Sequence, residues 1–385
     1  MMNTTKGNTT QGQSREPKPV RVIISGGGTG GHIFPAIAIA NAVRGRWPQA
    51  DILFVGAENR MEMERVPAAG YPIIGLPVAG FDRRNLFRNV SVAVKLFRSM
   101  KRARKIVDDF KPDIAVGVGG YASGPTLKAA SAKGIPTLLQ EQNSYAGVTN
   151  KMLAQRATTI CVAYEGMEKF FPKEKIVLTG NPCRQDLVIS KENREQGYAH
   201  FQLDPQKKTI LMVGGSLGAR TLNESIVAAF PTLREREDAQ VIWQCGKYYY
   251  QELQQLYADG KIPPQVHLLD FVDRMDYAYA VADLVISRAG AGSISEFCLL
   301  EKPVILVPSP NVAEDHQTRN AQALVKKDAA VMVSDVLAPA VLFDVALSLV
   351  QNDDQLKSLS RHIARLAQRD SAQRIADEMA KIMAR

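Results

Sequence analysis

The chain has 385 residues, of which 45% are hydrophobic and 23% charged, and this size and composition predict a globular protein with two domains rather than one core. The formal net charge of +9 favours an anionic partner, such as a nucleotide, an anionic membrane surface or nucleic acid. No apolar run approaches the roughly 18 residues that a membrane span needs. The four cysteines have neither metal-type nor CxxC spacing, so we expect reduced thiols in a cytosolic protein.

Residues 1–18 are polar and lack the apolar core of a signal peptide, so we expect a disordered leader and a cytoplasmic product. β-favouring residues 20–25 then lead into the glycine run 26–31, and apolar residues follow at helical spacing. This order predicts a strand, a tight turn and a helix whose first N–H groups can approach an anion. His32 stands at this helix start and suits a general base that the helix N-terminus keeps neutral; the alternative is a histidine that only caps or packs.

Strands alternate with helices along the rest of the chain, which is typical of parallel βαβ units. We predict further strands at residues 51–56, 71–78, 112–117, 136–140, 157–162, 175–178, 209–213, 241–244, 266–269, 284–287 and 303–307. The pattern restarts after a turn at 180–184. This restart predicts an α/β fold of two Rossmann-like domains, 19–178 and 179–355, that face each other across a cleft. A last helix at 356–385 should pack back toward the first domain.

The second half has its own candidate ligand loops. The glycine turn 214–219, with the hydroxyl of Ser216, is typical of a phosphate cradle. Glu296 should lie near the end of the first turn of the following small-residue helix, where it could bind a ribose diol or merely favour the helix dipole. Arg184 could meet an anion and Gln317 a sugar hydroxyl, although both residue types are also common on solvated surfaces.

Basic and apolar residues alternate in the segment 81–105, which predicts a helix that contacts an anionic membrane surface. The predicted contacts are Phe81, Arg83, Arg84, Leu86, Phe87 and Arg88. The alternative is a core-facing helix with a solvated basic face. No recognised nucleic-acid-binding module surrounds the segment, so nucleic acid is not an expected partner. No cluster has convincing metal-ligand spacing, so we expect no bound metal.

Gly26, Gly28 and Gly31 satisfy the G-x-G-x-x-G pattern of dinucleotide-binding dehydrogenases. The nearest acidic residue at a strand end, Glu58, lies further on than the usual spacing of about 20 residues. This pattern also leaves His32 and the second glycine turn without a role, so we do not favour a dehydrogenase.

Six motifs occur together in a specific order. They are GGTGGH at 27–32, GGYASGP at 119–125, EQN at 141–143, GNPCR at 180–184, GGSLGA at 214–219 and AGAGSISE at 289–296. The set resembles the MurG family of bacterial peptidoglycan glycosyltransferases, which belongs to glycosyltransferase family 28 and has the GT-B fold. The resemblance covers nearly all of the chain after residue 18.

The resemblance implies an inverting transfer of GlcNAc from UDP-GlcNAc to the C4 hydroxyl of the MurNAc of lipid I, which gives lipid II without a cofactor. It implies that His32 is the base. It implies donor contacts at Thr29, Gly30, Gly31, Asn143, Arg184, Ser216, Val272, Ala291, Gly292, Ser293, Glu296 and Gln317. Acceptor contacts are implied at Gly28, Gly30, Gly31, Gly119, Gly120, Tyr121 and Glu141. Thr318 departs from the second Gln of many members, which puts part of the sugar recognition in doubt.

The family also implies a peripheral location on the cytoplasmic face of the inner membrane and a place in a cell-wall synthesis complex. Two other functions stay open at this point. A UDP-GlcNAc 2-epimerase would use the donor without a lipid acceptor, and a non-catalytic nucleotide-sugar-binding or scaffold protein would tolerate the loss of His32.

Overall fold

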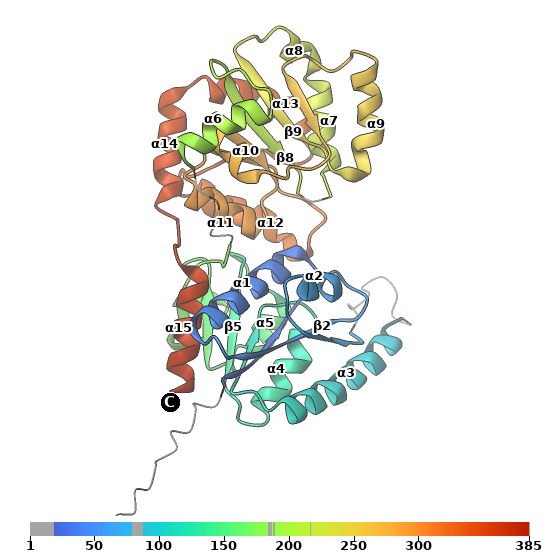
Figure 1. Cartoon of the computed structure of the whole chain (residues 1–385), viewed down its shortest axis with the longest axis vertical. Helices are drawn as coiled ribbons and strands as arrows, with labels where there is room; N and C mark the ends of the chain where they lie inside the picture. Colours follow the sequence, from blue (N-terminus) through green and yellow to red (C-terminus); the bar gives the residue numbers. More distant parts are fainter. Residues whose placement is uncertain (1–18, 79–87, 184–186, 188, 216, 385) are drawn as a thin grey trace, which may run out of the picture.

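The computed structural model describes residues 19–384 except 79–87, 184–186, 188 and 216. The described residues form two halves, each built on a parallel sheet with helices on both faces (Figure 1). The α/β class with two Rossmann-like halves, predicted from the alternation of strands and helices, is confirmed. Among these residues, no helix combines the length and apolarity that a membrane crossing requires.

The first sheet has the order β3-β2-β1-β4-β5-β6-β7. Its strands are β1 (Arg21–Ser25), β2 (Asp51–Ala57), β3 (Ile73–Leu76), β4 (Ile114–Gly117), β5 (Thr137–Glu141), β6 (Thr159–Val162) and β7 (Ile176–Leu178). Its helices are α1 (Gly30–Arg46), α2 (Glu62–Ala68), α3 (Arg88–Phe110), α4 (Ser123–Ser131) and α5 (Val148–Leu153). The strands are apolar along their length because helices cover both faces of a parallel sheet.

The second sheet has the order β10-β9-β8-β11-β12-β13. Its strands are β8 (Lys208–Val213), β9 (Ala239–Gln244), β10 (Val266–Leu269), β11 (Leu284–Ser287), β12 (Val304–Leu306) and the short β13 (Val331–Met332). The helices of this half are α6 (Lys191–His200), α7 (Arg220–Ala228), α8 (Phe230–Arg234), α9 (Lys247–Ala258), α10 (Met275–Val281), α11 (Ala291–Leu299), α12 (His316–Val325), α13 (Ala338–Val350) and α14 (Asp353–Ala364). Strand order reverses beside β1 in the first sheet and beside β8 in the second, and these are the places where such sheets bind ligands.

The prediction of one C-terminal helix is wrong. Helix α14 packs against α11 and α13 of the second half, whereas α15 (Ser371–Met383) packs against α1 of the first half. Asp370, between the two helices, has a φ of 56°, a left-handed conformation that cannot continue an α-helix. Ile375, Met379 and Ile382 of α15 are buried in the same apolar cluster as Val22 and Ile24 of β1.

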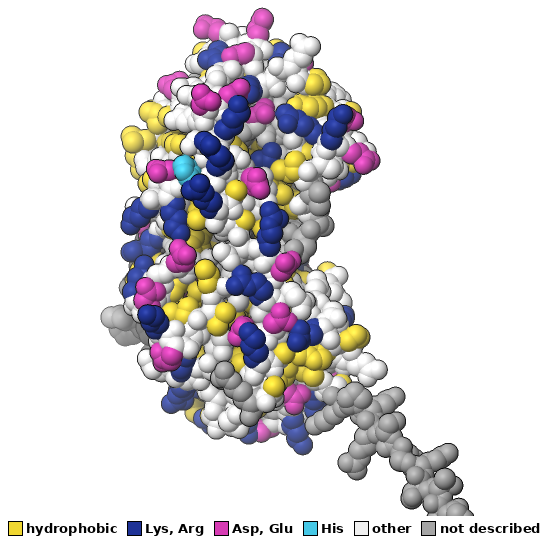
Figure 2. Space-filling model, turned by 90° about the vertical axis from the view of Figure 1, so that its left-hand side faces the viewer, with side chains coloured by type: hydrophobic (Ala, Val, Ile, Leu, Met, Phe, Trp, Pro, Cys, Tyr) yellow, Lys and Arg dark blue, Asp and Glu magenta, His cyan; other side chains and the backbone are white. Residues whose placement is uncertain are grey.

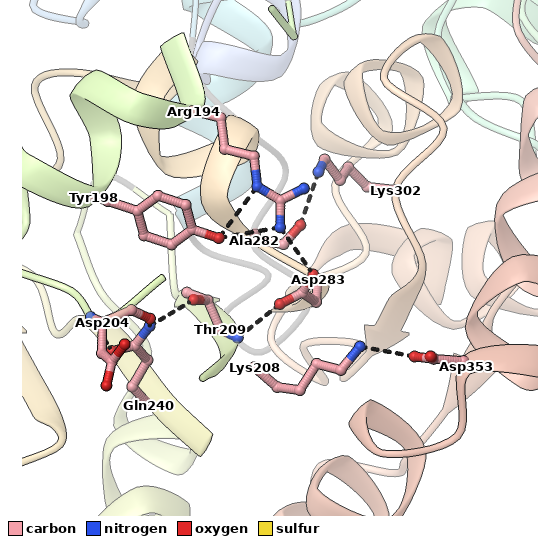
Figure 3. A network of polar contacts seen from close by, with 10 residues as sticks. All are labelled: Arg194, Tyr198, Asp204, Lys208, Thr209, Gln240, Ala282, Asp283, Lys302 and Asp353. Atoms are coloured by element: carbon pink, nitrogen blue, oxygen red, sulfur yellow. Dashed lines mark hydrogen bonds and ion pairs between the residues drawn. The ribbon is translucent and has the colours of Figure 1, made fainter. Parts of the chain in front are cut away.

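A polar network closes the amino end of the second sheet, opposite the ligand-binding edge (Figure 3). The Asp283 carboxylate accepts a hydrogen bond from the Thr209 N–H at 2.8 Å and pairs with Arg194 at 3.5 Å. Nearby, the buried Lys302 donates from Nζ to the Ala282 carbonyl at 2.7 Å. These contacts satisfy groups that the strand ends leave unpaired.

Candidate functional site

Two glycine loops of the first half pack backbone against backbone. They follow β1 and β4, which are neighbours where the strand order reverses. Gly120 has a φ of 82°, and a Cβ there would lie 2.4 Å from the Gly27 carbonyl oxygen. A Cβ on Gly119 would lie 2.9 Å from His32 Cε1. Larger residues would therefore force these loops and the imidazole apart.

Glu62, which belongs to none of the predicted motifs, fixes the first glycine loop. Its carboxylate is buried and accepts hydrogen bonds from the Gly28 N–H at 3.0 Å and the Ala57 N–H at 2.9 Å. A Cβ at Gly27 would lie 2.1 Å from Glu62 Oε1. The one signal in the sequence was an acidic residue at the start of the short helix α2.

The hydrogen bonds of His32 define its tautomer. Its Nδ1 lies 3.1 Å from Oε1 of the buried Gln142, whose Nε2 donates to the Val118 carbonyl at 2.8 Å. Because Gln142 presents its amide oxygen to the ring, Nδ1 carries the proton, and this assignment follows from the hydrogen-bond partners. The Nε2 atom then holds the lone pair, which can accept a proton from a hydroxyl group.

The pKa of His32 lies below its ordinary value of 6.5, chiefly because the ring is buried. The Glu141 carboxylate and the Gln142 hydrogen bond oppose this shift, while the imidazole of His316 adds to it. His316 begins α12 of the second half, so both halves influence this ring. A neutral imidazole near pH 7 is the form that a general base needs.

A buried chain of amides links His32 to the second half. Gln140 contacts the Gln142 amide and donates to Asn181 Oδ1 at 3.1 Å. Asn181 in turn donates to the Gln142 carbonyl at 3.0 Å and to Ser295 Oγ of α11 at 3.1 Å. The position of the histidine is therefore coupled to helix α11.

Glu141 and Asn143 organise the loop after β5. The buried Glu141 carboxylate accepts from the Gly147 N–H at 3.0 Å, from Asn150 Nδ2 at 2.9 Å and from the Asn143 N–H at 3.1 Å. Glu141 thus holds this loop and acts on His32 through its charge. Asn143 Oδ1 accepts from Asn320 Nδ2 of α12 at 3.1 Å, so this predicted donor contact lies where the two halves meet.

The second half repeats the packing of two glycine turns. A Cβ at Gly218 would lie 1.9 Å from the Cys245 carbonyl oxygen, and one at Gly246 would lie 2.4 Å from that of Leu217. The neighbouring loop leads into α11, whose first residues are Ala291, Gly292 and Ser293. A helix start beside such close turns is a place where backbone N–H groups can bind an anion.

Glu296 lies in the second turn of α11, so the prediction that it lies near the end of the first turn is wrong. Because the effect of the helix dipole falls off within the first turn, it stabilises this carboxylate less than predicted. Its carboxylate accepts a hydrogen bond from the buried Tyr279 hydroxyl at 3.0 Å. The Val272 side chain is buried in the core of the second half, which leaves its backbone for any ligand contact.

Gln317 and Thr318 stabilise the start of α12. Gln317 Oε1 accepts from the Ser309 N–H at 2.8 Å, and the Thr318 hydroxyl donates to Asp315 Oδ1 at 2.6 Å. Gln317 therefore also shapes the loop before this helix.

Several predicted residues lie outside the described part of the chain. They are Arg184, Ser216, Phe81, Arg83, Arg84, Leu86 and Phe87. Arg88 begins α3, but its side chain is also outside that part. Further along α3, Val94, Leu96 and Phe97 are exposed, as is Tyr121 beside the second glycine loop. In the described ranges, no group of three or more His, Cys, Asp or Glu side chains is placed to hold a metal ion.

Comparison with known families gives matches over both halves. Residues 22–162 match the glycosyltransferase family 28 N-terminal domain, and residues 209–375 match the family 28 C-terminal domain.

Glu58, the acidic residue that was considered for the dehydrogenase pattern, forms an ion pair with Arg102 of α3.

Relatives with high identity extend over nearly the whole chain. A Bacteroides thetaiotaomicron protein is 63% identical over 95% of this chain and 98% of its own length, and a Parabacteroides distasonis protein is 64% identical over 94% and 98%. Both are named UDP-N-acetylglucosamine–N-acetylmuramyl-(pentapeptide) pyrophosphoryl-undecaprenol N-acetylglucosamine transferase.

Solved structures share the fold. Acinetobacter baumannii MurG superposes with a TM-score of 0.76 at 30% identity, covering 94% of this chain and all of that one. A UDP-N-acetylglucosamine 2-epimerase superposes with a TM-score of 0.63 at 16% identity, over 94% and 95% of the two chains, which shows a common fold alone.

Proposed function

The chain belongs to glycosyltransferase family 28, and from that premise we propose that it transfers GlcNAc from UDP-GlcNAc to the lipid I acceptor named in its relatives. It is a UDP-GlcNAc-dependent hexosyltransferase of the MurG type. The epimerase alternative is supported only at the level of the fold, because the relatives above 60% identity are named transferases. A protein of this type makes lipid II for peptidoglycan.

The observation that carries the mechanism is the His32 tautomer. In our proposal, Nε2 takes the proton of the MurNAc C4 hydroxyl while its oxygen attacks the anomeric carbon of GlcNAc. The bond from that carbon to the UDP oxygen breaks on the opposite side, so UDP leaves and the anomeric centre inverts. Because His32 Nδ1 donates its proton to Gln142 Oε1, Nε2 is the nitrogen that can take the proton of the hydroxyl group.

The glycine loops of the first half and the start of α11 in the second half then bind different ligands. We assign the acceptor diphosphate to the loops at Gly28–Gly31 and Gly119–Tyr121, where Glu62 holds the backbone in place. We assign UDP to the second half, with the diphosphate at the start of α11 and the ribose on Glu296. Backbone N–H groups placed beforehand would stabilise the charge that develops on the leaving diphosphate.

The acceptor carries a lipid, and this favours a position on the cytoplasmic face of the membrane. The exposed apolar side chains Leu96 and Phe97 on α3, next to Lys95 and Arg98, support contact with an anionic membrane surface. We propose the same for the preceding residues 81–88. Membership of a cell-wall synthesis complex stays a prediction.

The direct test is UDP release from UDP-GlcNAc by the purified protein with and without a lipid I analogue. Release should require the analogue, and His32→Ala should lower turnover by about 10²-fold or more. Release without an acceptor would favour an epimerase-like use of the donor. Full turnover by His32→Ala would remove this residue from the role of base.

The matched control is His267→Ala, because His267 lies on β10 at the far edge of the second sheet. This variant should keep its turnover. Equal losses in both variants would point to a general loss of folded protein rather than to a missing base.

A further inference from the structure

A pocket of about 560 Å³ lies between the two halves, beside the amide network that reaches His32. Ser144, Asn181 and Ser295 of that junction line one part of it. None of the described residues predicted to bind donor or acceptor lines it. Its volume suits a ligand of roughly nucleotide size.

Both passages of the chain between the two halves border this pocket. Gly180 and Gln368 line it, and they belong to the segments after β7 and after α14. The two segments are in close contact, because a Cβ at Gly180 would lie 2.2 Å from Gln368 Cβ. A bound molecule would therefore contact both halves where the chain passes from one to the other.

The lining of the pocket is strongly basic. Glu165 is its one acidic residue among the described ones, against five basic residues: Lys169, Arg319, Lys326, Lys327 and Arg365. Glu165 pairs with Lys327 at 2.9 Å, and Arg319 stacks on Tyr145 with its guanidinium 4.1 Å from the ring centre. The excess of positive charge favours an anionic ligand. Figure 2 shows Lys and Arg side chains over both halves on the side of the molecule that carries α14 and α15.

The Tyr164 hydroxyl also indicates a ligand that can form a hydrogen bond. Tyr164 lines the pocket, and its hydroxyl oxygen is buried and has no hydrogen-bond partner in the described part of the chain. A buried hydroxyl without a partner is unfavourable, whereas a hydrogen bond to a charged oxygen would stabilise it.

We propose that this pocket binds a small phosphate-bearing molecule. The Tyr164 hydroxyl would donate to a phosphate oxygen, while Arg365 and Lys326 supply positive charge from two different elements. The volume of the pocket leaves room for a base or sugar attached to the phosphate. The site is separate from the one assigned to UDP, and the proposal does not depend on the transferase activity.

The test is calorimetric titration of pyrophosphate into the full chain, in which variants of the pocket identify the part of the binding that belongs to it. We expect binding, weakened at least 10-fold in Arg365→Gln/Lys326→Gln and roughly 10-fold in Tyr164→Phe, the usual effect of losing a hydrogen bond to a charged group. The matched control Lys357→Gln/Arg361→Gln removes two exposed charges of α14 outside the pocket and should bind as the parent does.

A second arm uses ATP and inorganic phosphate as probes. Tighter binding of ATP than of pyrophosphate identifies a nucleotide-type ligand, and the reverse order identifies a simple phosphate, both within the proposal. Thermal melting and turnover without any probe show that each variant is folded. The proposal is overturned if the full chain binds none of the probes, or if the pocket variants bind them as tightly as the control.

Discussion

His32 shows how burial and one hydrogen bond together set the chemistry of a residue. Burial lowers its pKa below 6.5, so the ring stays neutral until the pH falls through that lowered value. His32 loses its base form only when the pH is below this lowered pKa. We therefore expect the acidic limb of kcat/KM, which reports the free enzyme, to lie below pH 6.5.

Gln142→Met tests the same feature. Gln142 raises the pKa of His32 and fixes its tautomer, so its loss should move the acidic limb to still lower pH and reduce kcat by roughly 10-fold. Steady-state rates from pH 5 to 8.5 measure both effects. A limb above pH 6.5 in the parent would contradict the neutral base.

Lys302 offers a test of stability rather than of activity. Burial lowers its pKa from 10.5 to about 8, so between these values the unfolded chain binds a proton that the folded chain does not. Its contribution to the free energy of unfolding should therefore rise with pH through this window, by on the order of 3 kcal/mol in total. Below pH 8 the lysine is charged in both states, and its contribution no longer changes with pH.

The measurement is urea unfolding of the parent and of Lys302→Met at several pH values from 7 to 10.5. The difference between the two proteins cancels the other titrating groups. A difference that does not change with pH would show that Lys302 keeps its ordinary pKa.

At the scale of elements, α3 is the helix whose exposed face most needs an explanation. Phe97 is 74% exposed and Leu96 51% exposed, among lysines and arginines. If this face enters a membrane surface, Leu96→Ser/Phe97→Ser should weaken binding to anionic vesicles by about 10-fold or more, because each apolar side chain is worth roughly 1–2 kcal/mol when buried.

The control for α3 is Tyr248→Ser/Tyr257→Ser on α9. These side chains are 81% and 62% exposed but belong to the second half. Co-sedimentation with anionic and neutral vesicles compares the two pairs. Equal binding of vesicles by the α3 variant and the parent would show that this face of α3 is a solvated basic surface.

The helices and strands were largely predictable, because hydrophobic periodicity and turn-forming residues determine them locally. The strand, glycine turn and helix around residues 20–43 form as expected, and so does the alternation that defines both sheets. What local pattern could not supply were Glu62, Gln142 and Asn320. Their contacts join residues 34, 110 and 177 positions apart, so their roles exist only once the chain is folded.

At the scale of the whole molecule, Asn320 holds the two halves together. It is fully buried on α12; its Oδ1 accepts from the Ser144 N–H at 2.9 Å, and its Nδ2 donates to Asn143 at 3.1 Å. Both partners belong to the first half. Asn320→Ala should leave these groups unpaired, cost roughly 1–3 kcal/mol, and lower kcat/KM by about 10-fold because the two halves of the site lose their alignment.

Asn223→Ala is the matched comparison for Asn320. Asn223 is also buried, but it binds Cys245 and Trp243 within the second half. Thermal melting should show a similar loss of stability in both variants, whereas kinetics should show the loss of kcat/KM in Asn320→Ala alone. Unchanged kinetics in Asn320→Ala would mean that this contact does not align the site.

The place of α15 has a consequence for the order in which the protein can be made. Ile375, Met379 and Ile382 belong to the same apolar core as β1, yet they follow every strand of both sheets in the chain, so a ribosome adds them after those strands. Until then, the apolar side chains that α15 covers on the first half stay exposed, and a nascent chain that has already formed both sheets still presents them to chaperones or to other chains. The first half to be synthesised is thus the last to be finished.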